Sequence, residues 1–190
     1  MRRARENPFA TDRVLRERFR LDASGWALLG ARLRGLRHRG AIVGPHGSGK
    51  TTLLEDLARR FTAQGWRVVS VQLTVEHPAL GLAIPRQRLT ALEPRDLLLI
   101  DGAEQLSPWQ WWLVRFRARQ AGGIIITTHT PGRLPTLWRC RTSPELLRDL
   151  VDSLGVPLAV CEATDLFERH RGNLRDAIRE LYDRYAENAG

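Results

Sequence analysis

The sequence predicts an α/β fold, in which a parallel sheet of about five strands is followed by a small helical region. Three observations predict it. Short apolar runs alternate with amphipathic helical stretches between residues 24 and 142. A glycine-rich loop joins the apolar run 39–43 to a long helical stretch, and the later run 96–101 ends in a carboxylate. Beyond residue 143 the pattern is helical only, so we expect two parts, 1–142 and 143–190.

The composition is that of an ordinary globular chain. Of the 190 residues, 43% are hydrophobic and 27% are charged. No apolar run approaches the roughly 18 residues that span a bilayer, and the arginine-rich start is not followed by an apolar signal segment. We therefore expect a cytoplasmic protein with no membrane partner. The two cysteines, Cys140 and Cys161, lack the spacing of a metal site, so we expect reduced thiols.

The charge is unevenly distributed along the chain. The net charge is +9, and the excess lies in residues 1–142, whereas residues 143–190 carry more acidic than basic side chains. A basic body favours contact with a nucleic acid. Self-association of the body with the acidic tail, or a protein partner, is the alternative. Of the 30 basic residues 29 are arginine, and this usage also arises from genomic base composition.

Residues 44–51 fit the pattern G-x-x-x-x-G-K-[ST], the phosphate-binding P-loop. Its glycines let successive backbone N–H groups turn toward a phosphate, and a helix that begins at Lys50 adds its positive end. Lys50, the only lysine in the sequence, is expected to contact the β- and γ-phosphates, and Thr51 to bind Mg²⁺. We thus expect ATP and Mg²⁺ as cofactors. The expected nucleotide-binding residues form one continuous segment: Gly44, Pro45, His46, Gly47, Ser48, Gly49, Lys50, Thr51 and Thr52.

Two later apolar runs end in side chains suited to the same site. The run 96–101, DLLLID, has the Walker B pattern, in which a buried strand delivers Asp101 to its carboxyl end opposite Thr51, as a second Mg²⁺ ligand. The run 123–129, GIIITTH, is expected to lie between the P-loop strand and the Walker B strand. It would direct Thr127 or Thr128 toward the γ-phosphate or the attacking water. Further strands are expected at 67–73 and 136–142.

Ser107 and Pro108 predict the start of a helix with an unusual number of aromatic residues. Its core stripe is expected to comprise Trp109, Trp112, Leu113 and Phe116. Trp111, Val114 and Ala118 continue the apolar surface round the helix, so we expect it to bury two faces. As an alternative, Trp111 and Arg115 would form an exposed platform on which a base or a partner stacks. Other helices are expected at 12–20, 24–37, 50–64, 86–92, 144–154, 164–170 and 173–187.

With P-loop, Walker B, a polar-ended fourth strand and a helical lid in this order, residues 7–187 resemble the AAA+ ATPases, especially the initiator, clamp-loader and transposition-helper branches. The resemblance implies a three-layer P-loop NTPase fold and ATPase activity. Residues 172–177 look like the lid motif whose arginine, sensor 2, reads the γ-phosphate, which implies that role for Arg175 and the sensor 1 role for Thr128. Residues 135–140 look like the clamp-loader segment that bears an arginine finger, which implies that Arg139 acts in trans. The alternative for Arg139 is a strand residue facing solvent.

One departure from the family concerns the reaction itself. Directly after the Walker B aspartate, where the family carries a water-activating glutamate, this chain has Gly102, and the nearest acid is Glu104. We expect Glu104 to act as the general base, with a solvent-facing Glu104 as the alternative. A missing base lowers the rate by about 10²- to 10⁴-fold. The short link between the fourth and fifth strands also weakens the case for a closed hexamer.

These patterns predict a DNA-associated ATPase that uses ATP to drive a change in conformation or assembly. The first alternative is a protein-interaction switch that binds ATP and hydrolyses it slowly or not at all. A small-molecule kinase is the third option, against which the acidic tail argues.

Overall fold

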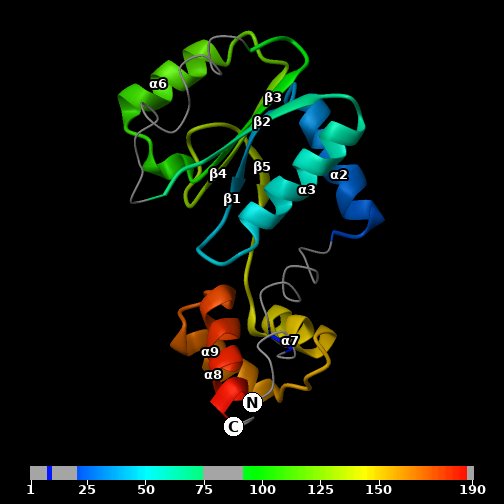
Figure 1. Ribbon diagram of the computed structural model, residues 1–190, viewed down its shortest axis with the longest axis vertical. Coiled ribbons are helices and arrows are strands. Elements are labelled where there is room, and N and C mark those ends of the chain that lie inside the picture. The colour runs from blue at the N-terminus through cyan, green and yellow to red at the C-terminus, as the bar shows by residue number, and fades with distance from the viewer. Residues whose placement is uncertain (1–7, 10–20, 75–91, 188–190) are drawn as a thin grey trace. The chain divides into compact units, whose positions relative to one another are not determined.

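The computed structural model describes Pro8, Phe9 and residues 21–74 and 92–187. Two compact units make up the chain: an α/β unit within residues 21–44 and 50–139, and a helical unit formed by residues 45–49 and 140–187 together with Pro8 and Phe9. Figure 1 shows the elements of each unit. The helices expected at 12–20 and 86–92 lie outside the described residues, apart from Leu92.

The α/β unit is built on a parallel sheet, as the sequence predicts. Its described strands are β1 (Arg39–Val43), β2 (Arg67–Gln72), β3 (Asp96–Asp101), β4 (Gly123–Thr128) and β5 (Thr136–Arg139). They lie in the order β2-β3-β4-β1-β5, and every neighbouring pair is parallel. The predicted insertion of β4 between β1 and β3 is therefore confirmed. Because parallel strands share a direction, the carboxyl ends of β1, β3 and β4 meet at one edge.

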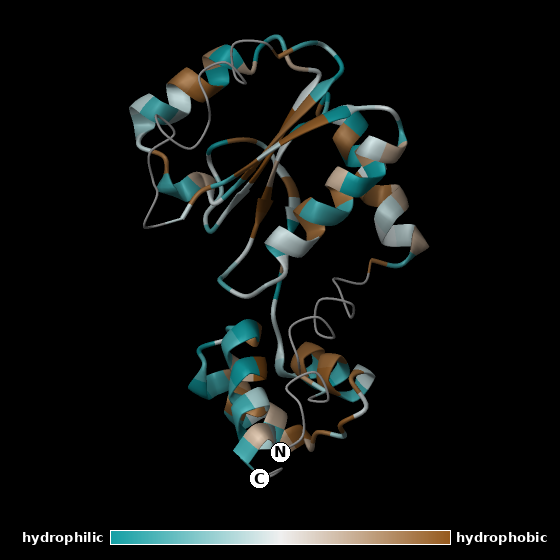
Figure 2. Cartoon of the chain, viewed as in Figure 1, coloured by the Kyte–Doolittle hydropathy of each residue, from teal (hydrophilic) through white to brown (hydrophobic). Residues whose placement is uncertain are grey.

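Helices cover both faces of this sheet (Figure 1). The helices α2 (Ala23–Gly35) and α3 (Lys50–Ala63) lie on one face and α6 (Pro108–Arg117) on the other. The central strands are consequently buried along their length, which explains the unbroken Leu and Ile runs in β3 and β4. Figure 2 shows these hydrophobic residues along the strands. On α3 the buried side chains include the predicted Leu53, Leu57 and Phe61.

An ion pair joins the first residues of β2 and β3. Asp96, with a nearly buried side chain, accepts hydrogen bonds from Arg67 Nε at 2.6 Å and from the backbone N–H of Glu93 at 2.6 Å. The hydrogen bond from Arg67 holds the pKa of Asp96 below its usual value, although burial opposes this effect. The pair therefore contributes stability at neutral pH, and this contribution is lost as the pH falls through the lowered pKa.

The core stripe predicted for α6 is wrong, and the helix buries one face rather than two. Trp109, Trp112 and Phe116 are 67%, 53% and 53% exposed, whereas Trp111, Val114 and Ala118 are buried against the sheet. Both sets have helical spacing, so periodicity alone does not identify the core face. The observed core face carries the smaller Val114 and Ala118, which let the helix lie close to the strands. Trp111 is accordingly not an exposed platform, and Arg133 lies against its ring at 5.5 Å from the ring centroid.

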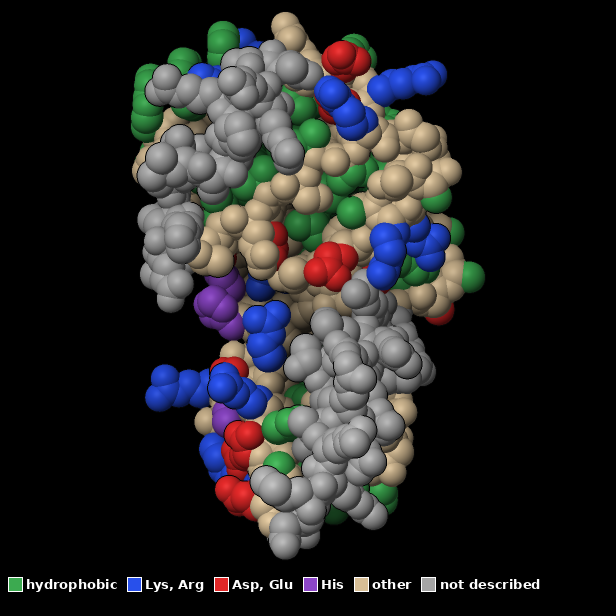
Figure 3. Space-filling model, viewed as in Figure 1, with side chains coloured by type: hydrophobic (Ala, Val, Ile, Leu, Met, Phe, Trp, Pro, Cys, Tyr) green, Lys and Arg blue, Asp and Glu red, His purple; other side chains and the backbone are tan. Residues whose placement is uncertain are grey.

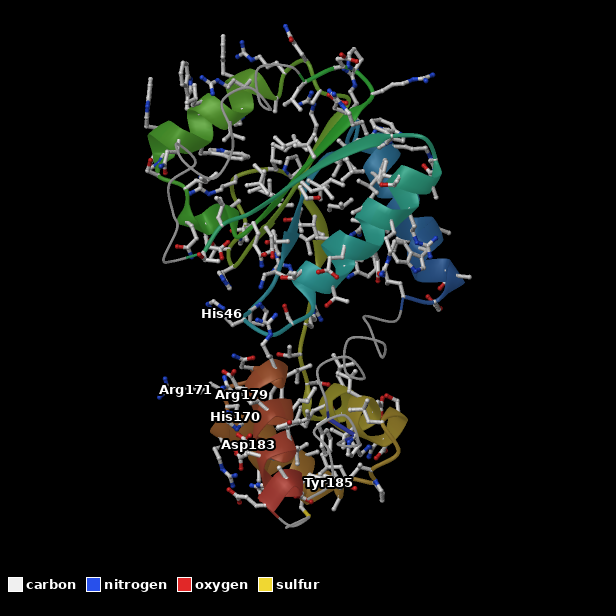
Figure 4. All side chains as sticks on the ribbon, viewed as in Figure 1. His46, His170, Arg171, Arg179, Asp183 and Tyr185 are labelled. Atoms are coloured by element: carbon white, nitrogen blue, oxygen red, sulfur yellow. The ribbon has the colours of Figure 1, made fainter. Side chains whose placement is uncertain are left out.

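The helical unit contains α7 (Pro144–Ser153), α8 (Val160–Arg169) and α9 (Leu174–Glu187). Helix α8 begins at Val160 rather than at the expected Thr164. The apolar stripe of α9 packs on α7 and α8 through Leu174, Ala177, Ile178 and Leu181. Phe9 completes this core by contacting Tyr185 edge-on, with 6.2 Å between ring centroids (Figure 4). Over residues 21–74 and 92–187, no helix has the length and apolar content required to cross a bilayer.

Candidate functional site

The loop between β1 and α3 has the backbone shape of a phosphate cradle. Gly47 and Gly49 adopt φ angles of 69° and 81°, which side-chain-bearing residues rarely adopt. Ser48 is buried, and its Oγ donates to the carbonyl of Pro45 at 2.8 Å. His46 lies in the same loop (Figure 4). Helix α3 begins at Lys50, directly after the second of these glycines, so its free N–H groups continue the loop.

The first turn of α3 carries the three predicted side chains Lys50, Thr51 and Thr52. The Lys50 side chain is buried although it bears a charge, a position that favours an anionic ligand. Thr51 Oγ1 donates to Asp101 Oδ2 at 2.9 Å, so the structure brings the two expected metal ligands together from β3 and α3. Hydroxyl and carboxylate oxygens are ligands that Mg²⁺ prefers. The donor set therefore fits this ion.

Thr127, at the carboxyl end of β4, fixes the second oxygen of Asp101. Its hydroxyl donates to Asp101 Oδ1 at 2.5 Å and accepts from the backbone N–H of Gly102 at 2.8 Å. Thr128 instead donates to the carbonyl of Thr130 at 3.1 Å. Of the two threonines that the sequence offers, Thr127 is thus the one that contacts the Walker B carboxylate. The sensor 1 role of Thr128 stays a prediction.

The structure gives a physical reason for Gly102. Its φ is 80°, and a Cβ atom at this position would lie 2.6 Å from the carbonyl oxygen of Leu73. A hydrogen bond keeps Leu73 close to this position: its backbone N–H donates to the carbonyl of Asp101 at 2.9 Å. A glutamate therefore does not fit directly after Asp101. The 3-10 turn η2 (Ala103–Gln105) follows and presents Glu104 instead.

Glu104 is paired with a residue that the sequence analysis did not select. Its Oε1 lies 2.8 Å from Nε2 of His129, and both side chains are only 24% exposed. Its Oε2 is buried and has no hydrogen-bond partner among the residues that the structure describes. The Glu104 carboxylate is therefore held by His129 and is largely withdrawn from solvent. The sequence signal for His129 was its position at the polar end of the β4 run.

The two predicted arginines lie on different units. Arg139 is exposed at the end of β5, next to Val43 of β1 in register. Arg175 is exposed on the first turn of α9, off the buried stripe as expected. Because Arg175 belongs to the helical unit, its contact with a nucleotide stays a prediction. The action of Arg139 on a neighbouring subunit stays a prediction as well.

Restoring the family's glutamate by Gly102→Glu is expected to destabilise the protein rather than activate it. A non-glycine residue at this φ costs about 1–3 kcal/mol before the contact with Leu73 is counted. For a chain of this size we expect a melting temperature about 5–10 °C lower. Thermal unfolding followed by circular dichroism measures this shift, with Gln120→Glu at an exposed residue outside the helices and strands as a control for added charge. An unchanged melting temperature together with faster ATP turnover would contradict this steric explanation.

Comparison with known proteins identifies the fold. No protein-family model matches the chain, and no curated protein matches it. Among solved structures, the chain is similar to RuvB of Thermotoga maritima, described as a Holliday junction branch migration motor. The identity is 21% and the TM-score 0.54, over 93% of this chain and 62% of that one. It is also similar to a threonine-to-valine variant of Thermotoga maritima RuvB, at 20% identity and a TM-score of 0.52, over 85% and 59% of the two chains.

This chain thus spans about three fifths of the length of these RuvB chains. At such identity the likeness concerns the fold, and the branch expected from the sequence stays a prediction. The parallel sheet with β4 inserted between β1 and β3 agrees with that likeness. The chain has the α/β fold of the AAA+ P-loop ATPases.

Proposed function

We propose that this protein is a Mg²⁺-dependent ATPase that associates with DNA and uses ATP to drive a change in conformation or assembly. The observation that carries the proposal is the chain of contacts from Thr51 through Asp101 to Thr127, at the sheet edge where β1 leads into the glycine-rich loop. Three elements, α3, β3 and β4, supply these side chains. Such convergence at the carboxyl edge of a parallel sheet is typical of a nucleotide site.

Each residue has a chemical role in this proposal. Backbone N–H groups of residues 47–51 and the ammonium group of Lys50 bind the β- and γ-phosphates. Thr51 and Asp101 hold Mg²⁺, which when bound neutralises charge on the phosphate oxygens. Thr127 keeps both oxygens of Asp101 in a single orientation. Thr128, Arg139 and Arg175 are proposed to sense or stabilise the γ-phosphate.

Glu104 is proposed as the general base. Its carboxylate accepts a proton from water, and the water oxygen forms a bond to the γ-phosphorus. The bond from that phosphorus to the bridging oxygen breaks, and ADP leaves with the electron pair. His129 holds Glu104 through Oε1 and thereby aims Oε2. The unpartnered Oε2 supports this role over a solvent-facing glutamate.

Association with DNA rests on charge and on the solved structures. The net charge is +9, with the excess in residues 1–142, and Figure 3 shows basic side chains on the face in view. The similar RuvB is described as a branch migration motor for a DNA junction. An electrostatic interface of this kind binds DNA most strongly at low salt and weakens steeply as salt rises.

The DNA association is tested by measuring the binding of duplex and single-stranded DNA over a salt series, with and without ATP. We expect binding at low salt, with an affinity that falls linearly with salt on a logarithmic scale. If neither form of DNA binds at the lowest salt, the DNA association is wrong. ATP turnover without DNA is measured in parallel and tests the ATPase proposal separately.

The second candidate function is a protein-interaction switch that binds ATP with little hydrolysis. Gly102 at the usual glutamate position and the exposed aromatic residues of α6 favour it. Turnover that depends on Glu104 would exclude this candidate.

A further inference from the structure

We infer that the exposed face of α6 is a binding site for single-stranded nucleic acid, whose unpaired bases stack on aromatic rings. Trp109, Trp112 and Phe116 form this face, called here the aromatic ladder. The inference rests on the DNA association proposed above and specifies which form of DNA is bound and where.

The rings of the aromatic ladder are already arranged as a stack. The centroids of Trp109 and Trp112 are 4.9 Å apart with planes 15° from parallel, and those of Trp112 and Phe116 are 5.7 Å apart at the same angle. The Cζ atom of Arg119 lies 5.3 Å from the Phe116 centroid. Three rings thus form one column along the helix surface, and Arg119, just beyond the end of α6, lies over the last of them. The outer face of such a column is a platform on which an unpaired base can stack.

This face is solvent-exposed because the opposite face of α6 forms the core. Trp111, Val114 and Ala118 occupy the sheet side, so the ladder has no sheet to cover it. Each of its three side chains is more than half exposed. The other large exposed apolar side chains in the described residues, Leu28, Leu146 and Val160, occur singly on separate helices. A contiguous apolar patch of this kind marks an interaction site, whereas scattered ones do not.

The charge around the aromatic ladder is positive, which favours an anionic partner. The sequence contains no Asp or Glu between Glu104 and Glu145, a stretch that holds all of α6. Arg115 and Arg119 are both exposed, and Arg119 lies against the Phe116 ring. Where Figure 1 places α6, Figure 3 shows hydrophobic side chains projecting with basic ones beside them. Rings for bases and guanidinium groups for phosphates are the two components of single-strand binding surfaces.

Unpaired bases fit this surface better than a duplex does. In a duplex each base face is covered by its neighbours, so only the phosphates can be contacted without unstacking. At one end of the column Arg119 lies against the Phe116 ring. At the other end is Trp109, the most exposed of the three rings, whose outer face is available for a base. We therefore expect Trp109 to contribute most to base stacking, with Arg115 and Arg119 contacting the phosphates.

The test compares three labelled ligands by fluorescence anisotropy on the full chain: an oligothymidine, a duplex of equal length and an abasic oligonucleotide with the same number of phosphates. We expect the wild type to bind the oligothymidine most tightly. Trp109→Ala is expected to weaken oligothymidine binding about 5- to 100-fold and to leave abasic binding unchanged. Trp109→Phe keeps a ring and should retain most of the affinity. Leu28→Ala, a truncation of another exposed apolar side chain, is the matched control and should have no effect.

Several results would overturn the inference. Equal affinity of the wild type for the oligothymidine and the abasic strand shows that the phosphates alone are recognised. If a Trp109→Ala, Trp112→Ala double variant binds the oligothymidine as tightly as the wild type does, the rings likewise contribute nothing to binding. If light scattering shows that the double variant dissociates an oligomer without changing DNA affinity, the ladder is an interface between copies of this chain.

These failures can be told apart from failure of the proposed function. ATP turnover without DNA should be the same in wild type and in the Trp109 variants, because the ladder belongs to no part of the nucleotide site. If duplex binds and the ladder variants are neutral, the DNA association stands and only the stacking site is wrong. If no nucleic acid binds at low salt, the DNA association and the inference both fail.

Discussion

Replacement of Glu104 by glutamine is expected to lower the rate of ATP hydrolysis about 10²- to 10⁴-fold, the contribution of a positioned general base. Glutamine has nearly the shape of glutamate and can still accept a hydrogen bond from His129 through its amide oxygen. It cannot take a proton from water, because its amide group is a very weak base. ATP affinity should therefore be unchanged while turnover is lost. Phosphate release under steady state measures turnover, and a fluorescent ATP analogue measures affinity.

Glu168→Gln is the matched control for this variant. Glu168 is exposed on α8, so the same chemical change there should affect neither turnover nor affinity. Unchanged turnover in Glu104→Gln would show that another group activates water. Loss of ATP binding in the same variant would show a structural role for Glu104 instead. Either outcome would reject the assignment of Glu104 as the base.

Replacement of Lys50 by alanine is expected to weaken ATP binding by about two to three orders of magnitude. Lys50 is the only lysine in the sequence, and its side chain is buried at the start of α3. Removing one member of a buried charge pair costs about 3–5 kcal/mol, and about 1.4 kcal/mol corresponds to tenfold in affinity. Lys50→Arg should also bind weakly, because a guanidinium group is broader than an ammonium group. Isothermal titration with ATP and Mg²⁺ measures the affinities.

The control for Lys50→Ala also removes a positive charge from α3. Arg59 is exposed toward the end of that helix, so Arg59→Ala should bind ATP like the wild type. Circular dichroism verifies that both variants are folded. ATP affinity equal to wild type in Lys50→Ala would mean that the loop is not the phosphate site.

The sheet and the loop were predictable because their signals are local. Glycines at fixed spacing, a short apolar strand before them and a helix after them predict the phosphate loop without reference to the rest of the chain. Buried parallel strands reveal themselves as continuous apolar runs, such as those ending at Asp101 and Thr128. The polar residues at their ends then predict which sheet edge carries the site. The confirmed position of β4 between β1 and β3 follows from these signals together with the AAA+ resemblance.

The orientation of α6 was not predictable in this way. The helix carries apolar residues on both of its faces, and each set repeats at helical spacing. The buried face combines Trp111 with the smaller Val114 and Ala118, whereas Trp112 and Phe116 are exposed. The size of the aromatic side chains therefore did not predict which face of α6 is buried, because tertiary packing decides it.

The details of the site also depend on tertiary contacts. From the sequence, Gly102 shows only that the family's glutamate is absent. The structure adds the reason, because the Leu73 carbonyl occupies the space that a side chain at position 102 would need. The choice between Thr127 and Thr128 depends on the register of β4 against its neighbours. The partnership of Glu104 with His129 joins a short turn after β3 to the end of β4. None of these contacts has a signature in local sequence.

In the proposed function the protein hydrolyses ATP although Gly102 replaces the usual glutamate. The most direct test is a single-turnover measurement, in which excess protein is mixed with radiolabelled ATP and Mg²⁺ and the bound nucleotide is analysed over time. We expect bound ATP to be converted to ADP in the wild type and to stay intact in Glu104→Gln. Wild-type protein that binds ATP and returns it unhydrolysed would instead be a nucleotide-binding switch, and the proposed ATPase activity would be wrong.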